Sequence, residues 1–198
     1  MFRKLGLITA ALVLLMLGPQ SAVAQRNEVA VLLGGYVPIG NTLDVSPAVA
    51  LQGAFAHRIA SVPLAAVYLE LPVTVGFNVS ASGASGGIFS AANYSALFIT
   101  PGFKLKIAPD FFVSPFFVLG AGYARYHTDN AFLTTLHGGD TSNKAVYDFG
   151  GGMDIKVIPH VSVRGEVRDY RSASPDILSL LGIGGHNIVG AGGLVLQF

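Results

Sequence analysis

The feature that most constrains this chain is a two-residue period that recurs from Glu28 to the last residue. Over residues 161–168, Val or Gly fills every odd position, and Ser, Arg or Glu fills every even one. Residues 147–157 show the same split between apolar and small residues on one side and Asp, Gly and Lys on the other. Such alternation places side chains on opposite faces of a strand. Because only Pro159 and His160 separate the two segments, the pattern predicts a β-hairpin.

Strand patterns recur along the rest of the chain. In residues 67–77 and 97–107 the two faces again differ, whereas residues 111–126 are apolar on both faces and their register stays open. The sequence predicts about eight strands, in residues 28–36, 48–58, 67–77, 97–107, 111–126, 147–157, 161–170 and 187–198.

The expected connections alternate between short and long. An up-and-down barrel in an outer membrane has this asymmetry, with short periplasmic turns and longer external loops. The short turns are expected at residues 59–63, 108–110 and 159–160, and the long segments at residues 37–47, 80–93, 128–143 and 172–185.

Composition favours a sheet that closes within lipid. The chain is 52% hydrophobic and only 12% charged, and its 25 glycines disfavour a bundle of helices. Strands of about ten residues can cross a bilayer when tilted, but lipid offers no partners for edge backbone groups, so the sheet must close. We therefore predict an all-β fold, a closed antiparallel up-and-down transmembrane β-barrel.

The competing fold is a soluble secreted barrel of the lipocalin type, which holds its apolar face inward. Such a barrel needs a polar face toward water all round. Residues 111–124 and 187–198 carry no charge on either face, which favours the membrane barrel.

The first residues have the pattern of an export signal. Arg3 and Lys4 precede an apolar run over residues 5–17, and Ala22 and Ala24 provide the small residues of a cleavage site. The alternative, a membrane anchor, needs about 20 apolar residues. We predict a signal peptide at residues 1–24, removed on export, and a barrel domain at residues 25–198.

Charge and cysteine content exclude several classes of function. A net charge of +1 gives no cationic surface for nucleic acid. The absence of Cys excludes disulfides, thiolate metal sites and Cys nucleophiles.

The end of the chain carries the most specific resemblance. Residues 190–198 alternate and stop on the aromatic Phe198. In this the chain resembles the small outer-membrane β-barrel proteins of Gram-negative bacteria, of the OmpA-like transmembrane type. The resemblance implies a place in the cell outer membrane among its lipids and lipopolysaccharide, and recognition of Phe198 by the barrel-assembly machinery. The chain ends at the last strand, so a role in binding the cell wall is not implied. Aromatic girdles would be built from Tyr36, Tyr94, Tyr123, Tyr126, Tyr147 and Tyr170.

The polar faces of the strands predict the content of the lumen. An eight-stranded barrel has an interior just wide enough for side chains to fill, and buried charges require partners. Nearly balanced charges therefore favour a packed ionic plug, and a narrow channel for ions or small solutes is the alternative. The expected network consists of Glu70, Lys104, Lys106, Asp148, Asp154, Lys156, Arg164, Glu166 and Arg168.

Two chemical alternatives involve one external segment. A lipid A-modifying enzyme would use His127, Thr128 and Asp129, but such a site calls for Ser where Thr stands. His127 and Asp129 with His137 and Asp140 could in principle bind zinc, although a polar loop explains them equally. We expect no enzymatic activity, no metal and no cofactor.

The external segments are the remaining candidate for function. Residues 80–92 are small and read as a flexible loop, while Ser174, Pro175 and Asp176 followed by Ile177 read as the start of a short helix. Because binding functions concentrate on loops carried by rigid scaffolds, the sequence predicts a structural or surface-interaction role for the barrel.

Overall fold

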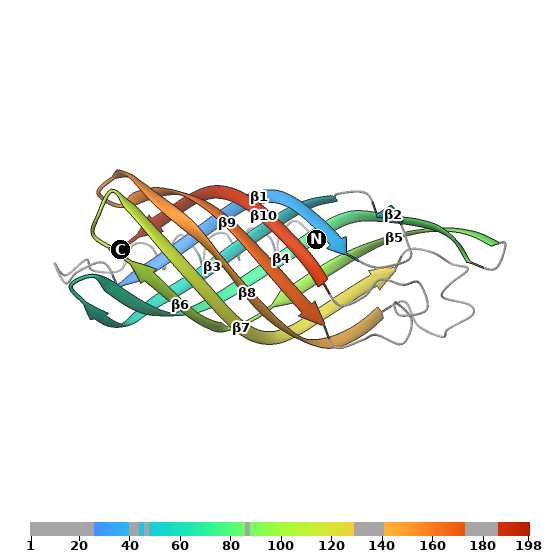
Figure 1. Ribbon diagram of the computed structural model, residues 1–198, viewed down its shortest axis with the longest axis horizontal. Helices are drawn as coiled ribbons and strands as arrows, with labels where there is room; N and C mark the ends of the chain where they lie inside the picture. The colour runs from blue at the N-terminus through green and yellow to red at the C-terminus, as the bar shows by residue number, and fades with distance from the viewer. Residues whose placement is uncertain (1–25, 40–43, 46–47, 86–87, 129–140, 173–185) are drawn as a thin grey trace, which may run out of the picture.

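The computed structural model describes residues 26–39, 44–45, 48–85, 88–128, 141–172 and 186–198, and every regular element in them is a β-strand (Figure 1). The expected signal peptide and the helix expected after Ser174 lie outside these residues. No helix among the described residues is long and apolar enough to cross a membrane.

Ten strands make a single sheet, and all of its pairings are antiparallel. They are β1 (Asn27–Ile39), β2 (Asp44–Val45), β3 (Ala48–Val62), β4 (Ala65–Ser85), β5 (Ile88–Ile99), β6 (Gly102–Ile107), β7 (Val113–Thr128), β8 (Thr141–Ile158), β9 (Val161–Ser172) and β10 (His186–Gln197).

The sheet closes on itself. From β1 it runs through β3 and β4 in one direction, and through β10, β9, β8 and β7 in the other, and β5 and β6 join β4 to β7. β5 and β6 are successive parts of one barrel strand, interrupted at Thr100 and Pro101. The barrel therefore has eight strands, with the two-residue β2 paired to β4 as an addition. The prediction of a closed antiparallel barrel is confirmed.

The first and last strands complete the closure. β1 and β10 pair from Glu28 opposite Gln197 to Ile39 opposite His186. Beyond them, the backbone N–H of Asn27 donates to the carbonyl of Phe198 at 2.8 Å, and the N–H of Phe198 donates back at 3.0 Å. The final aromatic residue is thus a structural part of the seam.

The tight turns lie at one end of the barrel, and the strand ends that border the longer connections lie at the other (Figure 1). We call these the turn end and the loop end. One expectation was wrong: residues 80–93 are mostly strand, because β4 continues to Ser85 and β5 resumes at Ile88. The pairing of Ser85 with Ile88 shows a long hairpin in place of a flexible loop. Small residues on both faces of a strand give the sequence no apolar–polar alternation to detect. The pairing of the backbone with the adjacent strand does not depend on that alternation.

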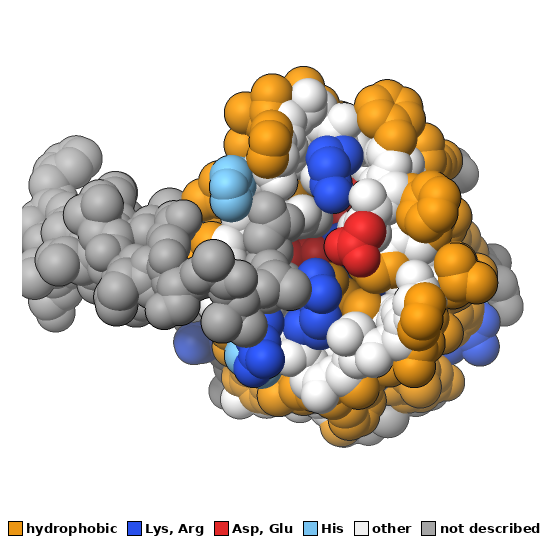
Figure 2. Space-filling model, turned by 90° about the vertical axis from the view of Figure 1, so that its left-hand side faces the viewer, with side chains coloured by type: hydrophobic (Ala, Val, Ile, Leu, Met, Phe, Trp, Pro, Cys, Tyr) orange, Lys and Arg blue, Asp and Glu red, His pale blue; other side chains and the backbone are white. Residues whose placement is uncertain are grey.

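Burial follows the alternation that the sequence shows. Outward positions are apolar and exposed, as at Leu33 (62%), Leu119 (63%) and Leu194 (59%). Seen from the turn end, hydrophobic side chains surround a mouth that holds charged ones (Figure 2). Apolar side chains so exposed around a closed barrel are suited to contact with lipid.

Of the six tyrosines expected in aromatic girdles, two face outward and three face inward, and the side chain of Tyr94 lies outside the described part of the structure. Tyr123 and Tyr147 lie on the outer face, 38% and 51% exposed. Tyr36, Tyr126 and Tyr170 are buried in the lumen and belong to no girdle. They stand at even positions, as the other inward residues of their strands do. The direction in which a strand position points therefore decides their place, although Tyr is common at membrane interfaces.

Candidate functional site in the barrel lumen

Charged side chains fill the part of the lumen nearer the turn end. Each is at most 4% exposed, and together we call them the charged layer. Its members are Glu28, Glu70, Lys104, Lys106, Asp148, Asp154, Arg164, Glu166 and Arg168.

Arg164 is the hub of this layer. Its Nε donates to Oδ1 of Asp154 at 2.6 Å and its Nη2 to Oδ2 at 2.8 Å, a bidentate pair between β9 and β8. The same Nη2 lies 3.1 Å from Oε2 of Glu28 on β1. The guanidinium also stacks 4.5 Å from the centre of the Phe116 ring. Arg164 therefore links three strands, in the geometry that makes arginine–carboxylate pairs strong.

The two lysines of β6 reach the same carboxylates from the opposite wall. Nζ of Lys104 lies 2.6 Å from Oε2 of Glu28 and 3.2 Å from Oε1 of Glu70. Nζ of Lys106 contacts Glu28 and lies 2.6 Å from Oδ2 of Asp154. Glu28 is thus shared by both lysines and by Arg164.

Arg168 organises the next level toward the loop end. Its Nη2 donates to Oε2 of Glu70 at 2.7 Å, its Nη1 to Oδ2 of Asp148 at 2.9 Å, and its Nε to Glu166. Glu166 also accepts a hydrogen bond from Nε2 of Gln52 on β3 at 2.8 Å. This level joins β3, β4, β8 and β9 across the lumen.

The charged layer is close to electrical balance. It holds five carboxylates and four cations, and every carboxylate contacts at least one cation. Removing a charge from water costs several kcal/mol unless partners compensate. Mutual pairing of this kind lets charges remain inside a narrow barrel, where they fasten opposite walls together.

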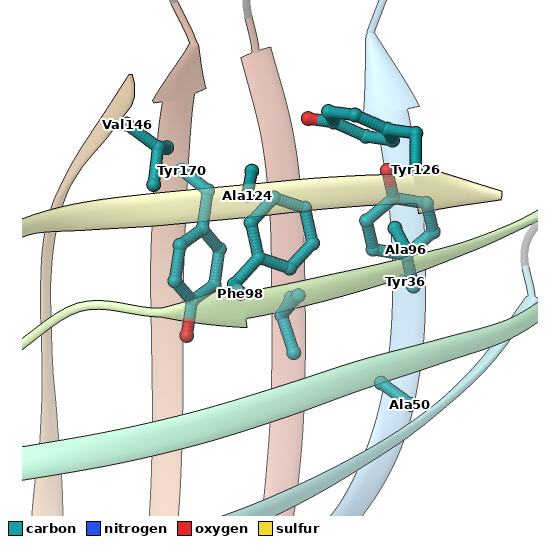
Figure 3. Close-up of a cluster of buried hydrophobic side chains, with 9 residues drawn as sticks. Tyr36, Ala50, Ala96, Phe98, Ala124, Tyr126, Val146 and Tyr170 are labelled. Carbon is teal, nitrogen blue, oxygen red and sulfur yellow. The ribbon is translucent and has the colours of Figure 1, made fainter. Parts of the chain in front are cut away.

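A second layer, nearer the loop end, is aromatic. Phe98 stacks on Tyr170 with ring centres 4.5 Å apart, meets Tyr126 edge-on at 5.9 Å, and lies 6.0 Å from Tyr36 (Figure 3). We call this cluster the aromatic layer. Its remaining members are Ala50, Ala96, Ala124, Val146 and Val189.

The tyrosine hydroxyls of the aromatic layer have hydrogen-bond partners. The hydroxyl of Tyr36 donates to Oδ1 of Asn187 at 2.6 Å, and Nδ2 of Asn187 lies 3.4 Å from the hydroxyl of Tyr126. The hydroxyl of Tyr170 lies 2.8 Å from Oγ1 of Thr74. These bonds let polar aromatic side chains fill a buried space.

Two glycines make room for the large side chains. A Cβ on Gly152 would lie 2.7 Å from Cζ of Phe116, beneath the Arg164 guanidinium. A Cβ on Gly76 would lie 3.2 Å from Cγ of Tyr36 in the aromatic layer. At these two positions the absence of a side chain leaves the room that the rings of Phe116 and Tyr36 occupy.

Eight of the nine expected network residues lie in the charged layer. Lys156 differs: it is half-buried on β8 near the turn end, and no ion pair joins it to another described residue. The pattern missed Glu28, which is a centre of the network. Glu28 stands at an even position, as do Ala30 and Leu32 on the same inward face, and extending that parity to the start of β1 would have found it.

The residues of the chemical alternatives are not brought together. His127 is exposed on the outer face of β7, whereas Asp148 points into the lumen and pairs with Arg168. Asp129, His137 and Asp140 lie outside the described residues. Within the part of the chain that the structure describes, no three His, Asp or Glu side chains are grouped as they would be to hold a metal ion.

Comparison with solved structures identifies the fold. Neisserial surface protein A is 11% identical with a TM-score of 0.60, covering 89% of this chain and 99% of that one. The attachment invasion locus protein Ail of Yersinia pestis, solved with the heparin analogue sucrose octasulfate, is 13% identical with a TM-score of 0.53, covering 88% and 97%. The outer membrane protein OprG of Pseudomonas aeruginosa is 14% identical with a TM-score of 0.52, covering 88% and 97%.

The chain has the fold of the small outer-membrane β-barrels. No protein-family model and no curated protein sequence matches it. At these identities the likeness concerns architecture, since one barrel fold serves many functions. What distinguishes this barrel is therefore to be sought in its own lumen and surface.

Proposed function

We propose that this protein is an integral component of the outer membrane with a structural or surface-interaction role, and that its lumen is closed to ions and solutes. The observation that carries the proposal is the pair of layers that cross the lumen, charged side chains toward the turn end and aromatic ones toward the loop end. A solute would have to displace both in order to pass.

The charge pattern supports a plug over a pore. Selective pores present rings of charge of one sign to the passing ion. Here carboxylates and cations alternate within contact distance, as in the group formed by Glu28, Lys106, Asp154 and Arg164. Side chains engaged in this way serve as cross-links between strands.

The loop end is the proposed surface for interaction. The hairpin of β4 and β5 extends beyond the other strands there, and β2 pairs with it (Figure 1). Export through the signal at residues 1–24 and insertion guided by Phe198 would place this end outside the cell. The fold neighbour Ail was solved with a sulfated sugar, and an anionic surface ligand is one partner class to test.

Conductance of the folded protein tests the closed lumen. We expect purified barrel inserted into planar bilayers to give no sustained unitary currents at any salt concentration. Insertion is verified separately, by the shift in gel mobility between unheated and boiled samples that folded outer-membrane barrels show. Steady currents from protein that passes this control would contradict the plug.

A further inference from the structure

A polar cluster interrupts the apolar outer wall at the loop end of β9. Nε of Arg171 donates to Oδ2 of Asp169 at 3.0 Å, and Nδ1 of His186 lies 3.0 Å from the same oxygen. The Arg171 guanidinium stacks 4.6 Å from the centre of the Phe149 ring. Asp169 takes only one nitrogen from each basic side chain, and the side chains of Arg171 and His186 stay 38% and 45% exposed.

This cluster is unusual for its place. Among the strand residues whose side chains the structure describes, the only charged ones that face outward are Arg125, Asp169 and Arg171, and all three lie toward the loop end. Tyr126 and Tyr170, the inward neighbours of Arg125 and Arg171, both contact Phe98, so the two arginines stand at one level of the barrel. Because outward arginines are costly at the middle of a bilayer and tolerated near its surface, this level suits the lipid headgroups.

An apolar groove runs down the wall directly below the cluster. It has a volume of about 350 Å³ and is lined by Pro115, Gly151, Met153, Val163, Gly165 and Val167 of β7, β8 and β9. β8 carries Phe149 above Gly151, and β9 carries Asp169 above Val167, so the cluster and the groove share two strands. The groove exists because Gly151 and Gly165 provide no side chain between their larger neighbours.

The cluster and the groove together match the depth of one leaflet. From Phe149 in the cluster to Ile155 at the lower end of the groove, a strand advances about 20 Å at roughly 3.3 Å per residue. A strand tilted by about 40° then descends about 15 Å, or half of a hydrocarbon core of about 30 Å. A basic site with an apolar groove directly beneath it is complementary to a single amphiphile, with its charged group above and one acyl chain below.

We propose that this surface binds one phosphorylated lipid of the outer leaflet, the lipid A part of lipopolysaccharide. Arg171 and His186 hold its phosphate, and one acyl chain lies in the groove past Gly165. Asp169 and Phe149 fix the orientation of Arg171 before the lipid arrives, which lowers the cost of ordering that side chain on binding. The inference rests on the proposed location in the outer membrane and adds a specific lipid to it.

Native mass spectrometry of the folded full chain, titrated with purified lipid A, tests this site. We expect Arg171→Gln and Gly165→Leu each to weaken lipid A retention roughly tenfold, because the first removes a charged donor and the second fills the groove. Lipid A stripped of its phosphates should bind the unmodified protein as weakly as lipid A binds Arg171→Gln.

The chain offers matched controls. Arg125→Gln removes an outward arginine at the same level, and Arg125 stands on β7 away from β9. Gly53→Leu adds the same side chain to the outer face of β3; neither Gly53 nor Gly165 has an atom within 4 Å of an added Cβ. Both controls should retain lipid A as the unmodified protein does.

Equal losses in the controls, or equal binding of the phosphate-free lipid, would overturn the site. Neither result would affect the proposed function, which the gel-mobility shift and the conductance measurement test without lipid A. All four variants must show that shift, so a loss of retention is read only from folded barrels.

Discussion

The two layers of the lumen are equally buried but are held by different forces. In the charged layer Arg164 pairs with both Glu28 and Asp154, and none of these charges would be tolerated there without a partner of opposite sign. In the aromatic layer Phe98 and its neighbours gain from contact, and each side chain contributes in proportion to the space that it fills. The stability of the charged layer depends on which side chains are paired, whereas that of the aromatic layer depends on how much volume is filled.

This difference explains how two separate layers fill the lumen of one narrow barrel. Opposite charges select which side chains meet across the lumen, so the pairs from β1, β6, β8 and β9 fix the relative positions of strands far apart in sequence. Aromatic rings then fill the remaining space toward the loop end with side chains that have few rotatable bonds. The layers should therefore respond oppositely when a second substitution is added to a first.

The largest expected effect is in the charged layer. Arg164→Leu should lower the free energy of unfolding by about 4 kcal/mol, because Asp154 and Glu28 keep their burial and lose a partner. Without Arg164 the charged layer holds five carboxylates and three cations, so adding Asp154→Asn should restore about 1–2 kcal/mol by removing one excess negative charge. Urea titration of the barrel in lipid vesicles, followed by gel mobility, measures both values.

Lys156→Gln is the matched control for this prediction. Lys156 is half-buried and outside the ion pairs of the described residues, so its loss should cost less than about 0.5 kcal/mol. If Asp154→Asn destabilised the Arg164→Leu protein further, mutual charge satisfaction would not be what holds this layer.

The aromatic layer should show the next largest effect. Phe98→Ala should cost about 3 kcal/mol, since it opens a cavity among Tyr36, Tyr126 and Tyr170. The milder Phe98→Leu should cost about 1 kcal/mol. Adding Tyr36→Ala to Phe98→Ala should deepen the loss in the same urea titration, where the charged layer shows recovery; a recovery here would remove the distinction between the layers.

The sequence predicted the charged layer better than the aromatic one, for a physical reason. Arg164, Glu166 and Arg168 alternate with Val and Gly on β9, so a single strand shows which face avoids lipid. Closure follows, because a strand with one apolar face in lipid needs partners on both edges, and the number of strands follows from counting the strand patterns along the chain. Which charged side chains meet across the lumen depends on the stagger between strands, and no local sequence pattern shows that stagger.

The misplaced tyrosines illustrate the limit. Tyr suits both a membrane interface and a polar interior, so Tyr36 and Tyr126 carry little information as residue types. Only their parity with Leu32 and Ala124 on the same strands shows that they face inward. On β7 both faces are apolar, so that parity could be assigned only after the pairing of β7 with β8 was known.

The smallest effect is expected at the boundary between the layers, where Thr74 and Tyr170 share a hydrogen bond of 2.8 Å. Tyr170→Phe keeps the ring against Phe98 but leaves Oγ1 of Thr74 buried without that partner, which should cost about 1 kcal/mol. Thr74→Val in the same protein removes the unsatisfied oxygen, so the double variant should recover most of the loss in the urea titration. Recovery would show that the boundary behaves as the charged layer does, because the two polar groups are needed only to satisfy each other. An additive loss would assign it to the aromatic layer, where Tyr170 contributes through packing alone.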